Sequence, residues 1–325
     1  MTKIVADLLP FPWHHDIWAK ITDSSKPMHP ARLFYGPSGI GKKQFAMAFS
    51  TWLLCDKPSD KACGQCENCL CFAAGHHPDF IALNDDKKVS IDQLREVVAC
   101  LNLAPNKGKY RVVLIDHVES LSDSSANVLL KTLEEPSARV RFLLLASHPR
   151  LMLSTIRSRC QALNLALFDL QLAASWLKAK HPEFAQVADC MRALVMSGDR
   201  PKKALDYLTC DNTKAAWQAL DHWFSSKQSS LMACLAVCKA LSVDDFFSIY
   251  HAYLSAMLCR FSVEACQEDS ISQAAFEATH QRFSLDALYG AYDRLMATML
   301  LGKSSALLPA EMLMTYALLG LKAEP

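Results

Sequence analysis

The stretch Gly36-Pro37-Ser38-Gly39-Ile40-Gly41-Lys42-Lys43 decides the fold that this sequence predicts. It matches the phosphate-loop pattern G-x-x-x-x-G-K-[ST] at every position except the last. In such a loop the backbone amides surround phosphates, the lysine contacts the β- and γ-phosphates, and the final hydroxyl holds Mg²⁺. The apolar segment 31–35 reads as a buried strand before the loop, and 42–54 reads as the helix after it. Because strand, loop and helix follow one another as the motif requires, we predict a phosphate loop rather than an ordinary glycine turn.

Two residues that ATP hydrolysis needs are replaced around this loop. Lys43 stands where the hydroxyl should be, and an ammonium group has only donors, so it cannot coordinate Mg²⁺. The apolar segment 111–116 ends in Asp116, like the ATPase strand whose aspartate steadies Mg²⁺, but His117 follows it in place of the glutamate that polarises water. We therefore predict that hydrolysis is lost and that ATP binding is weak or absent. The residues that would contact a nucleotide are Gly36, Gly39, Gly41, Lys42 and Asp116.

A group of cysteines follows the helix that this loop begins: Cys55, Cys63, Cys66, Cys69 and Cys71. Four thiolates bind Zn²⁺ tetrahedrally and leave no open position for water. The Cys63-x-x-Cys66-x-x-Cys69 spacing, with Cys55 before it, predicts a structural zinc site at Cys55, Cys63, Cys66 and Cys69. The residues between these cysteines have the composition of a loop. Two alternatives stay open, namely Cys71 in place of Cys69 as a ligand, or a reduced cysteine-rich loop without metal.

The composition limits the function classes. The chain has 325 residues, and 34 Lys and Arg against 33 Asp and Glu give a net charge of +1, which argues against a strongly basic nucleic-acid binder. The length predicts two or three domains. The sequence has no run of 18 apolar residues, and its start, Met1-Thr2-Lys3-Ile4, lacks the pattern of a signal peptide. We therefore expect a cytoplasmic protein with no membrane partner, whose 13 cysteines do not form a disulfide framework.

Strand-like and helix-like segments alternate over the first half of the chain. This alternation is typical of an α/β fold with a doubly wound parallel sheet. From Asp169 onward helical periodicity dominates. We predict an α/β core over 1–166 that contains the cysteine module 55–71, a small helical domain over 167–208 and an all-helical domain over 209–325. The predicted strands after the loop are 80–83, 111–116, 142–147 and 161–165, and the predicted helices between them are 91–103 and 122–135.

Several short motifs, in a constant order along the chain, carry a resemblance to a known family. They are the degenerate phosphate loop, the cysteine insert after its helix, Ala74-Gly75-His76-His77-Pro78-Asp79, Ser124-Ser125-Ala126-Asn127-Val128-Leu129-Leu130-Lys131-Thr132-Leu133-Glu134-Glu135-Pro136 and Ser158-Arg159-Cys160. The chain resembles the delta-prime subunits of the bacterial DNA polymerase III clamp loader, which belong to the AAA+ family. The resemblance covers residues 11–205, and its last two motifs are specific to clamp loaders.

The resemblance implies a fold and a role for each part. It implies an AAA+ core with a zinc insert over 1–166, a small helical lid over 167–208 and a collar over 209–325 that holds five subunits in a ring. The chain would be a largely non-hydrolysing structural subunit that helps to load the sliding clamp on primed DNA during replication. Its partners would be the gamma/tau and delta subunits and, through the complex, the sliding clamp and primer–template DNA. Nucleotidyltransferase activity would belong to the assembled polymerase, and the isolated chain is expected to have no ATPase activity.

The resemblance gives a catalytic role to Arg159. In this family the arginine of the Ser-Arg-Cys motif reaches the ATP site of the neighbouring subunit, where it stabilises charge on the transferring phosphoryl group. A guanidinium suits this role because its planar fork of donors stays charged. The resemblance also implies that Ser147, at the end of a strand, lies where AAA+ proteins place a polar residue near the γ-phosphate. Lys131, Glu134 and Glu135 form either an interface or the solvated face of a helix.

A related group of proteins supplies the alternative. The gamma/tau subunits share the cysteine insert, the Lys-Thr-Leu-Glu-Glu-Pro string and the Ser-Arg-Cys motif, but they keep Thr or Ser after the loop lysine and an Asp-Glu pair after the strand. Lys43 and His117 depart from that pattern in the direction of delta-prime. The competing hypothesis is an ATP-hydrolysing gamma/tau-type subunit or another AAA+ ATPase of DNA repair.

Overall fold

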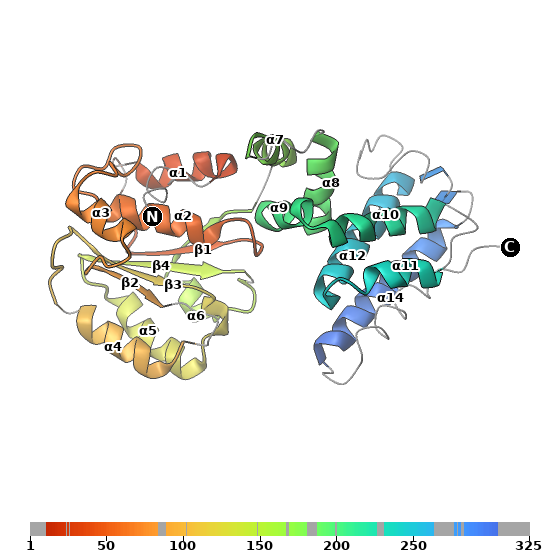
Figure 1. The fold of residues 1–325 in the computed structure, drawn as a ribbon. Coiled ribbons are helices and arrows are strands. Elements are labelled where there is room, and N and C mark those ends of the chain that lie inside the picture. Colours follow the sequence, from red (N-terminus) through yellow and green to blue (C-terminus); the bar gives the residue numbers. More distant parts are fainter. Residues whose placement is uncertain are drawn as a thin grey trace. The chain divides into compact units, whose positions relative to one another are not determined.

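In a computed structural model, the chain forms two compact units, Met1–Phe168 and Asp169–Pro325 (Figure 1). In the first unit a sheet lies between layers of helices, and the described part of the second unit is helical. The structure describes residues 11–23, 25, 27–83, 89–101, 103–147, 149–166, 169–180, 187–198, 200–225, 231–262, 276–277, 279–280 and 283–304.

The first unit is built around a parallel sheet of five strands in the order β2–β3–β4–β1–β5. The predicted parallel sheet is thus confirmed. The strands are β1 (Ala31–Tyr35), β2 (Phe80–Leu83), β3 (Arg111–Ile115), β4 (Val140–Ala146) and β5 (Gln161–Asn164). The helices are α1 (His15–Thr22), α2 (Lys42–Leu54), α3 (Glu67–Ala73), α4 (Ile91–Leu101), α5 (Asp123–Glu134) and α6 (Ser154–Arg157), with the short 3-10 helices η1 (Pro12–His14) and η2 (Val118–Ser120).

Helices cover both faces of this sheet (Figure 1). Successive residues of a strand point to opposite faces, so a strand buried on both sides is mostly apolar. In β3, Val112 and Leu114 pack with α1 and α2, whereas Val113 and Ile115 pack with α4, α5 and α6. All seven residues of β4 are buried. The sheet therefore stands at the centre of a two-sided core, which explains the continuous apolar runs in the sequence.

Side-chain caps fix where the helices over this core begin. Ser90 Oγ accepts from the Gln93 amide at 3.2 Å, and Gln93 Oε1 accepts from the Ser90 amide at 3.0 Å, which forms a capping box at the start of α4. Ser122 caps α5 by accepting from the Ser125 amide at 3.2 Å. The helix predicted over 91–103 ends at Leu101 in the structure.

The second unit packs its helices around an aromatic core. Trp217, Phe224, Tyr250 and Tyr253 are buried in it. Helix α8 packs on α7, α9 and α12, and α10 packs on α9, α11 and α12. Among the residues that the structure describes, no helix is both long and apolar enough to cross a membrane. The helices are α7 (Leu170–Lys180), α8 (Val187–Ser197), α9 (Pro201–Thr209), α10 (Asp211–Ser225), α11 (Leu231–Cys238), α12 (Val243–Ser262) and α14 (Leu285–Ser304).

Candidate functional site

The phosphate loop, Asp116 and Ser147 follow three neighbouring parallel strands. β4 lies between β1 and β3 in the sheet, so the loops after all three strands emerge at its carboxyl edge. The Gly36 amide donates to the Ala146 carbonyl at 3.3 Å, which fixes the start of the phosphate loop against the end of β4. Ligand sites of open parallel sheets lie at this edge. The topology therefore brings the predicted nucleotide contacts to one region.

Lys42 is bound to its own loop. Its Nζ donates to the carbonyls of Gly36 at 2.8 Å and Pro37 at 3.0 Å, and it lies 3.0 Å from Ser147 Oγ. An ammonium has three donors, so these contacts use all of them. The Lys42 side chain is buried, whereas Lys43 is exposed. A phosphate that approached Lys42 would have to replace hydrogen bonds that the lysine already makes.

An aromatic side chain lies directly on the loop at Gly41. Gly41 has φ +101°, and a Cβ added there would lie 2.2 Å from Cε2 of Phe11. Both the backbone conformation and the close approach therefore require glycine. The Phe11 ring stacks on Trp13 with a centroid distance of 4.6 Å. The sequence did not single out Phe11, because its contact with Gly41 depends on how the segment before β1 folds back.

The motif predicts a glutamate at position 117, directly after Asp116, but the structure brings Glu119 close to Ser147 instead. His117 has the left-handed backbone angles φ 48°, ψ 45°, and its side chain is exposed. Glu119, two residues later, accepts from the Ser147 amide at 2.8 Å through Oε1, while its buried Oε2 has no hydrogen-bond partner among the described residues. Asp116 accepts from the His117 amide at 3.0 Å. Glu119, rather than His117, thus lies against the residue that also contacts Lys42.

The thiols of Cys55, Cys63, Cys66 and Cys69 lie together, with all four sulfur atoms within 4.8 Å of one another. The Sγ–Sγ distances are 4.0 Å for Cys63–Cys69 and for Cys55–Cys66. A tetrahedral site with Zn–S bonds of about 2.3 Å has sulfur atoms roughly 3.8 Å apart. The four sulfur atoms are therefore spaced as a zinc ion requires.

Backbone amides donate hydrogen bonds to three of these sulfur atoms. The Cys63 amide donates to Cys55 Sγ at 3.3 Å, the Cys66 amide to Cys63 Sγ at 3.4 Å, and the Cys69 amide to Cys66 Sγ at 3.4 Å. Hydrogen bonds from the backbone amides of Gln65 and Cys66 lower the pKa of the Cys63 thiol to about 6. Burial raises the pKa of Cys69. Since a thiolate is the metal-binding form, the Cys63 sulfur is prepared for a cation at neutral pH.

Local structure decides between Cys69 and Cys71. The sequence predicted a loop here, but Cys66 Sγ caps a helix, α3, by accepting from the Cys69 amide. A helix turns about 100° per residue, so Cys69 and Cys71, two positions apart, point to different sides. Cys69 is buried within the sulfur cluster and Cys71 lies outside it. The expectation of a loop is therefore wrong for residues 67–73, and the fourth sulfur belongs to Cys69.

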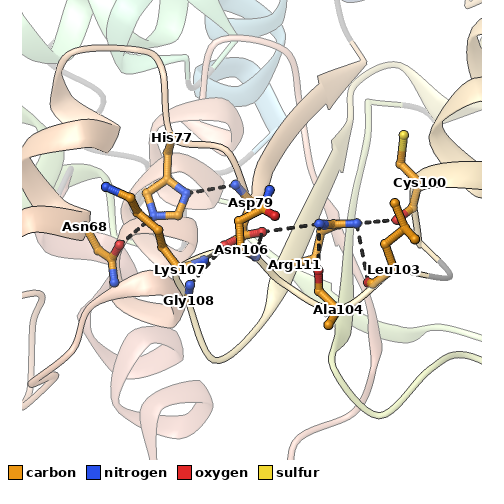
Figure 2. A network of polar contacts seen from close by, with 10 residues as sticks. All are labelled: Asn68, His77, Asp79, Cys100, Leu103, Ala104, Asn106, Lys107, Gly108 and Arg111. Atoms are coloured by element: carbon orange, nitrogen blue, oxygen red, sulfur yellow. Dashed lines mark hydrogen bonds and ion pairs between the residues drawn. The ribbon is translucent and has the colours of Figure 1, made fainter.

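A buried aspartate organises the turn beside this module (Figure 2). The Asp79 side chain is fully buried and accepts from the amides of Asn106 at 2.7 Å, Lys107 at 2.8 Å and Gly108 at 2.9 Å. Arg111 Nη2 lies 3.4 Å from Asp79 Oδ1. Burial disfavours the carboxylate, but these amide and guanidinium donors outweigh burial and lower the pKa of Asp79. Asp79 therefore stays ionised and holds the turn before β3.

The same network continues to the cysteine module. His77 Nδ1 accepts from the Asp79 amide at 3.1 Å, and its Nε2 donates to Asn68 Oδ1 at 3.2 Å. Burial lowers the pKa of His77, in keeping with a neutral ring that donates through one nitrogen and accepts through the other. Asn68, next to Cys69 in α3, donates to Asp56 Oδ1 at 2.7 Å. The sequence did not reveal this network, because several of its partners are remote along the chain.

Arg159 lies at the end of α6 and is paired with α5. Its Nη2 is 2.6 Å from Glu134 Oε1, and its Nη1 donates to the Thr155 carbonyl at 3.0 Å. The side chains of Arg159 and Glu134 are 35% and 51% exposed, so solvent and a partner can reach both. The sequence left Glu134 as either an interface residue or a solvated one, and the structure makes it the ion-pair partner of Arg159.

Comparison with known proteins gives the family. A family model described as "DNA polymerase III, delta subunit" matches residues 15–169. DNA polymerase III subunit delta' of Escherichia coli (strain K12) is 33% identical over 248 residues, which cover 74% of this chain and 70% of that protein. The chain belongs to the DNA polymerase III delta-prime family. The family assignment agrees with the resemblance carried by the sequence motifs.

Two further relatives set the extent of this similarity. The delta' subunit of Pseudomonas aeruginosa is 35% identical over 199 residues, and the chain spans 60% of the length of that relative. The tau subunit of Salmonella typhimurium is 37% identical, but the alignment covers 44% of this chain and 23% of tau. The similarity to delta' thus extends further along the chain than the similarity to tau.

Proposed function

We propose that this delta-prime family member is a largely non-hydrolysing structural subunit of the DNA polymerase III clamp loader. In the complex it helps to load the sliding clamp on primed DNA, in the cytoplasm, and it supplies Arg159 to the ATP site of a neighbouring subunit. Its partners are the gamma/tau and delta subunits and, through them, the clamp and primer–template DNA. Residues 1–166 act as the AAA+ core, 167–208 as the lid and 209–325 as the collar.

The contacts of Lys42 carry the proposal that hydrolysis is lost. The lysine that should contact the phosphates is held by two loop carbonyls and Ser147. No hydroxyl follows it to hold Mg²⁺, because Lys43 occupies that position and is exposed. A metal ion and a positioned water are central to phosphoryl transfer, so binding alone would not restore turnover. Gly36, Gly39, Gly41, Lys42 and Asp116 then form a weak nucleotide site or none.

The ion pair with Glu134 supports a surface role for Arg159. An arginine that acted within its own chain would need to reach its own phosphate loop, whereas Arg159 is held on the α5–α6 side of the unit by Glu134 and Thr155. Half-exposed ion pairs contribute only about 0–1 kcal/mol, so a neighbour's phosphates can replace Glu134 at small cost. The guanidinium then stabilises the charge that develops during ATP hydrolysis in the next subunit.

Structural zinc at Cys55, Cys63, Cys66 and Cys69 completes the proposal. The four sulfur atoms leave no position for a substrate or water, so the ion would have no catalytic role. Its effect would be to order residues 55–71. The module joins the core through Asn68 and His77, and an ion pair of Lys107 with Glu67 adds a second link.

One observation favours the alternative of an active ATPase. Close to Ser147, Glu119 has a buried oxygen with no partner among the residues that the structure describes, and a carboxylate at that place could polarise water or hold a metal ion. A glutamate that served this purpose would make turnover sensitive to Glu119→Gln as well as to Lys42→Ala. This sensitivity separates the two hypotheses.

The test is Mg²⁺-dependent ATP turnover by the purified chain, alone and mixed with the other loader subunits. We expect no turnover above background for the isolated chain. Lys42→Ala and Glu119→Gln should leave turnover of the assembled loader unchanged at equal assembly. Turnover by the isolated chain that disappears in either variant would move the protein to the enzymatic class.

A further inference from the structure

Two arginines on neighbouring strands are buried without a carboxylate partner. Arg32 in β1 and Arg141 in β4 are 6% and 9% exposed. β1 and β4 pair in parallel, and Phe34, Leu143 and Leu145 on these strands pack with α2. Because side chains alternate between faces, Arg32 and Arg141 project to that same face. Neither arginine forms an ion pair with a carboxylate of the described residues.

Most of the donors on these guanidinium groups have no partner among the described residues. Arg32 makes one long hydrogen bond, from Nη1 to the Ile21 carbonyl at 3.3 Å. Arg141 donates from Nη1 to the carbonyls of Ala138 at 2.9 Å and Val140 at 2.7 Å. The Nε of each arginine is buried and has no hydrogen-bond partner in the described part of the chain. A guanidinium has five N–H donors, and buried donors are normally satisfied.

Aromatic rings rather than counter-charges face the two arginines. The Cζ of Arg32 lies 4.8 Å from the centroid of the Phe49 ring, and the Cζ of Arg141 lies 4.1 Å from that of Tyr110. Burial, and then the charge of Arg141, lower the pKa of Arg32 to about 10. Cation–π contacts compensate a buried charge only partly. This part of the unit therefore carries positive charge that no carboxylate of the described residues balances.

Arg32 lines a cavity of about 570 Å³ at the amino edge of the sheet. Lys20, Lys109 and Gln161 line the same cavity, and all three are exposed. Gln161 is the first residue of β5 and pairs with Arg32. The phosphate loop follows the other end of β1, which has five residues and spans roughly 15 Å. The cavity is thus separate from the predicted nucleotide site.

Two carboxylates also line this cavity, and both have other donors. Asp23 Oδ1 accepts from the amide and the hydroxyl of Ser25 at 3.0 and 2.7 Å. Asp56 Oδ1 accepts from Asn68 Nδ2 at 2.7 Å. Neither carboxylate pairs with Arg32. The lining therefore combines an unbalanced buried guanidinium with exposed ammonium groups at its edge.

We propose that this cavity is a binding site for a phosphate group, with Arg32 as its principal donor. The planar fork of a guanidinium matches the oxygens of phosphate, and Lys20, Lys109 and Gln161 supply further donors. Arg141, on the neighbouring strand β4, adds positive charge close to Arg32. A bound phosphate would balance the buried charge and satisfy free donors together, which no group of the described chain does.

The test is isothermal titration calorimetry of the full chain with inorganic phosphate against chloride at equal ionic strength. The Lys42→Ala chain is titrated in parallel, so that binding at the phosphate loop is separated from binding at Arg32. We expect phosphate to bind both chains equally, and Arg32→Met to weaken binding by about tenfold or more. Arg95→Met, at an exposed arginine of α4, is the matched control and should bind like the wild type.

A melting measurement and a second set of variants keep the test independent of folding. Arg32→Met should unfold at the same temperature as the wild type or higher without phosphate, because it replaces an unbalanced buried charge by an apolar chain. If that variant fails to fold, the surface pair Lys20→Ala and Lys109→Ala should still weaken binding several-fold. The proposal is overturned if phosphate does not bind at millimolar concentration, if Arg32→Met binds like the wild type, or if Lys42→Ala abolishes binding.

Titration with a single-stranded oligonucleotide distinguishes a free phosphate ion from a phosphate of a DNA backbone. If the oligonucleotide binds, competes with inorganic phosphate and is weakened by Arg32→Met, the site takes a backbone phosphate of DNA. If inorganic phosphate alone depends on Arg32, the site takes a free phosphate ion. Both results support the site, and neither depends on the proposed role of Arg159.

Discussion

Replacing Asp79 by Asn tests the network that joins the cysteine module to the sheet. The Asp79 side chain is fully buried, and its two oxygens accept three backbone amides and face Arg111 (Figure 2). An asparagine has one oxygen in place of two, so its NH₂ group would face either the amides of Lys107 and Gly108 or the amide of Asn106 and Arg111. At least two buried donors would then lose their acceptor.

The magnitude follows from those lost contacts. A buried donor without an acceptor costs about 1–3 kcal/mol, and breaking a buried ion pair by removing one partner costs about 3–5 kcal/mol. We therefore expect the free energy of unfolding of the first unit to fall by about 4 kcal/mol at pH 7. For a unit of this size that corresponds to a fall in Tm of roughly 8–16 °C.

The measurement is differential scanning calorimetry, together with hydrogen exchange of the amides of residues 106–108. Asp92→Asn is the control, because Asp92 is 78% exposed and its ion pair with Arg95 is a surface pair. That variant should change Tm by only about 1–2 °C. Faster exchange at 106–108 in Asp79→Asn, and not in the control, would tie the loss of stability to this turn.

The pH dependence has a definite sign. The folded pKa of Asp79 is lowered, so the stability from its ionised form is fully present above the ordinary value of about 3.9 and is lost as the pH falls through the lower folded value. The difference in Tm between wild type and Asp79→Asn should persist near pH 5 and shrink only below about pH 4. A fall in Tm at pH 7 no larger than that of Asp92→Asn would refute the reasoning.

Three further predictions concern the zinc, the arginine and the loop. Metal analysis of reduced protein should find one zinc per chain, lost in Cys69→Ser and kept in Cys71→Ser. Equal zinc content in the two variants would contradict the ligand set. Arg159→Ala should lower ATP turnover of the assembled loader several-fold at equal assembly, because one of several ATP sites loses a rate enhancement of roughly 10³ or more. Arg157→Ala is the control and should leave the rate unchanged. Equal rates for the wild type and Arg159→Ala would mean that the Ser-Arg-Cys motif has only a structural role. Phe11→Ala should raise the affinity for a fluorescent ATP analogue, because it removes the ring that lies on the loop at Gly41. Unchanged affinity would show that the ring does not block the site.

The sequence by itself determined the strands of the first unit and the helix that follows the phosphate loop. β1 and α2 begin and end where the apolar segments 31–35 and 42–54 predicted them. Strands buried on both faces are mostly apolar, and the phosphate loop requires a strand before it and a helix after it. The spacing of Cys55, Cys63, Cys66 and Cys69 was equally local, because thiols that bind one ion need short connections. These features depend on neighbours in the chain, and residue patterns record them.

The tertiary structure alone decided which distant groups meet. Glu119 lies against Ser147, Glu134 pairs with Arg159, and Phe11 covers Gly41. Asp79 and Arg32 look like ordinary polar residues in the sequence. In the structure both are buried: Asp79 has four donors around it, whereas Arg32 has no carboxylate partner among the described residues. Charge balance in a buried environment is set by groups that the fold brings within a few ångströms from remote parts of the chain. No local pattern contains that information, so the partners of these residues emerge only once the sheet and its helices are assembled.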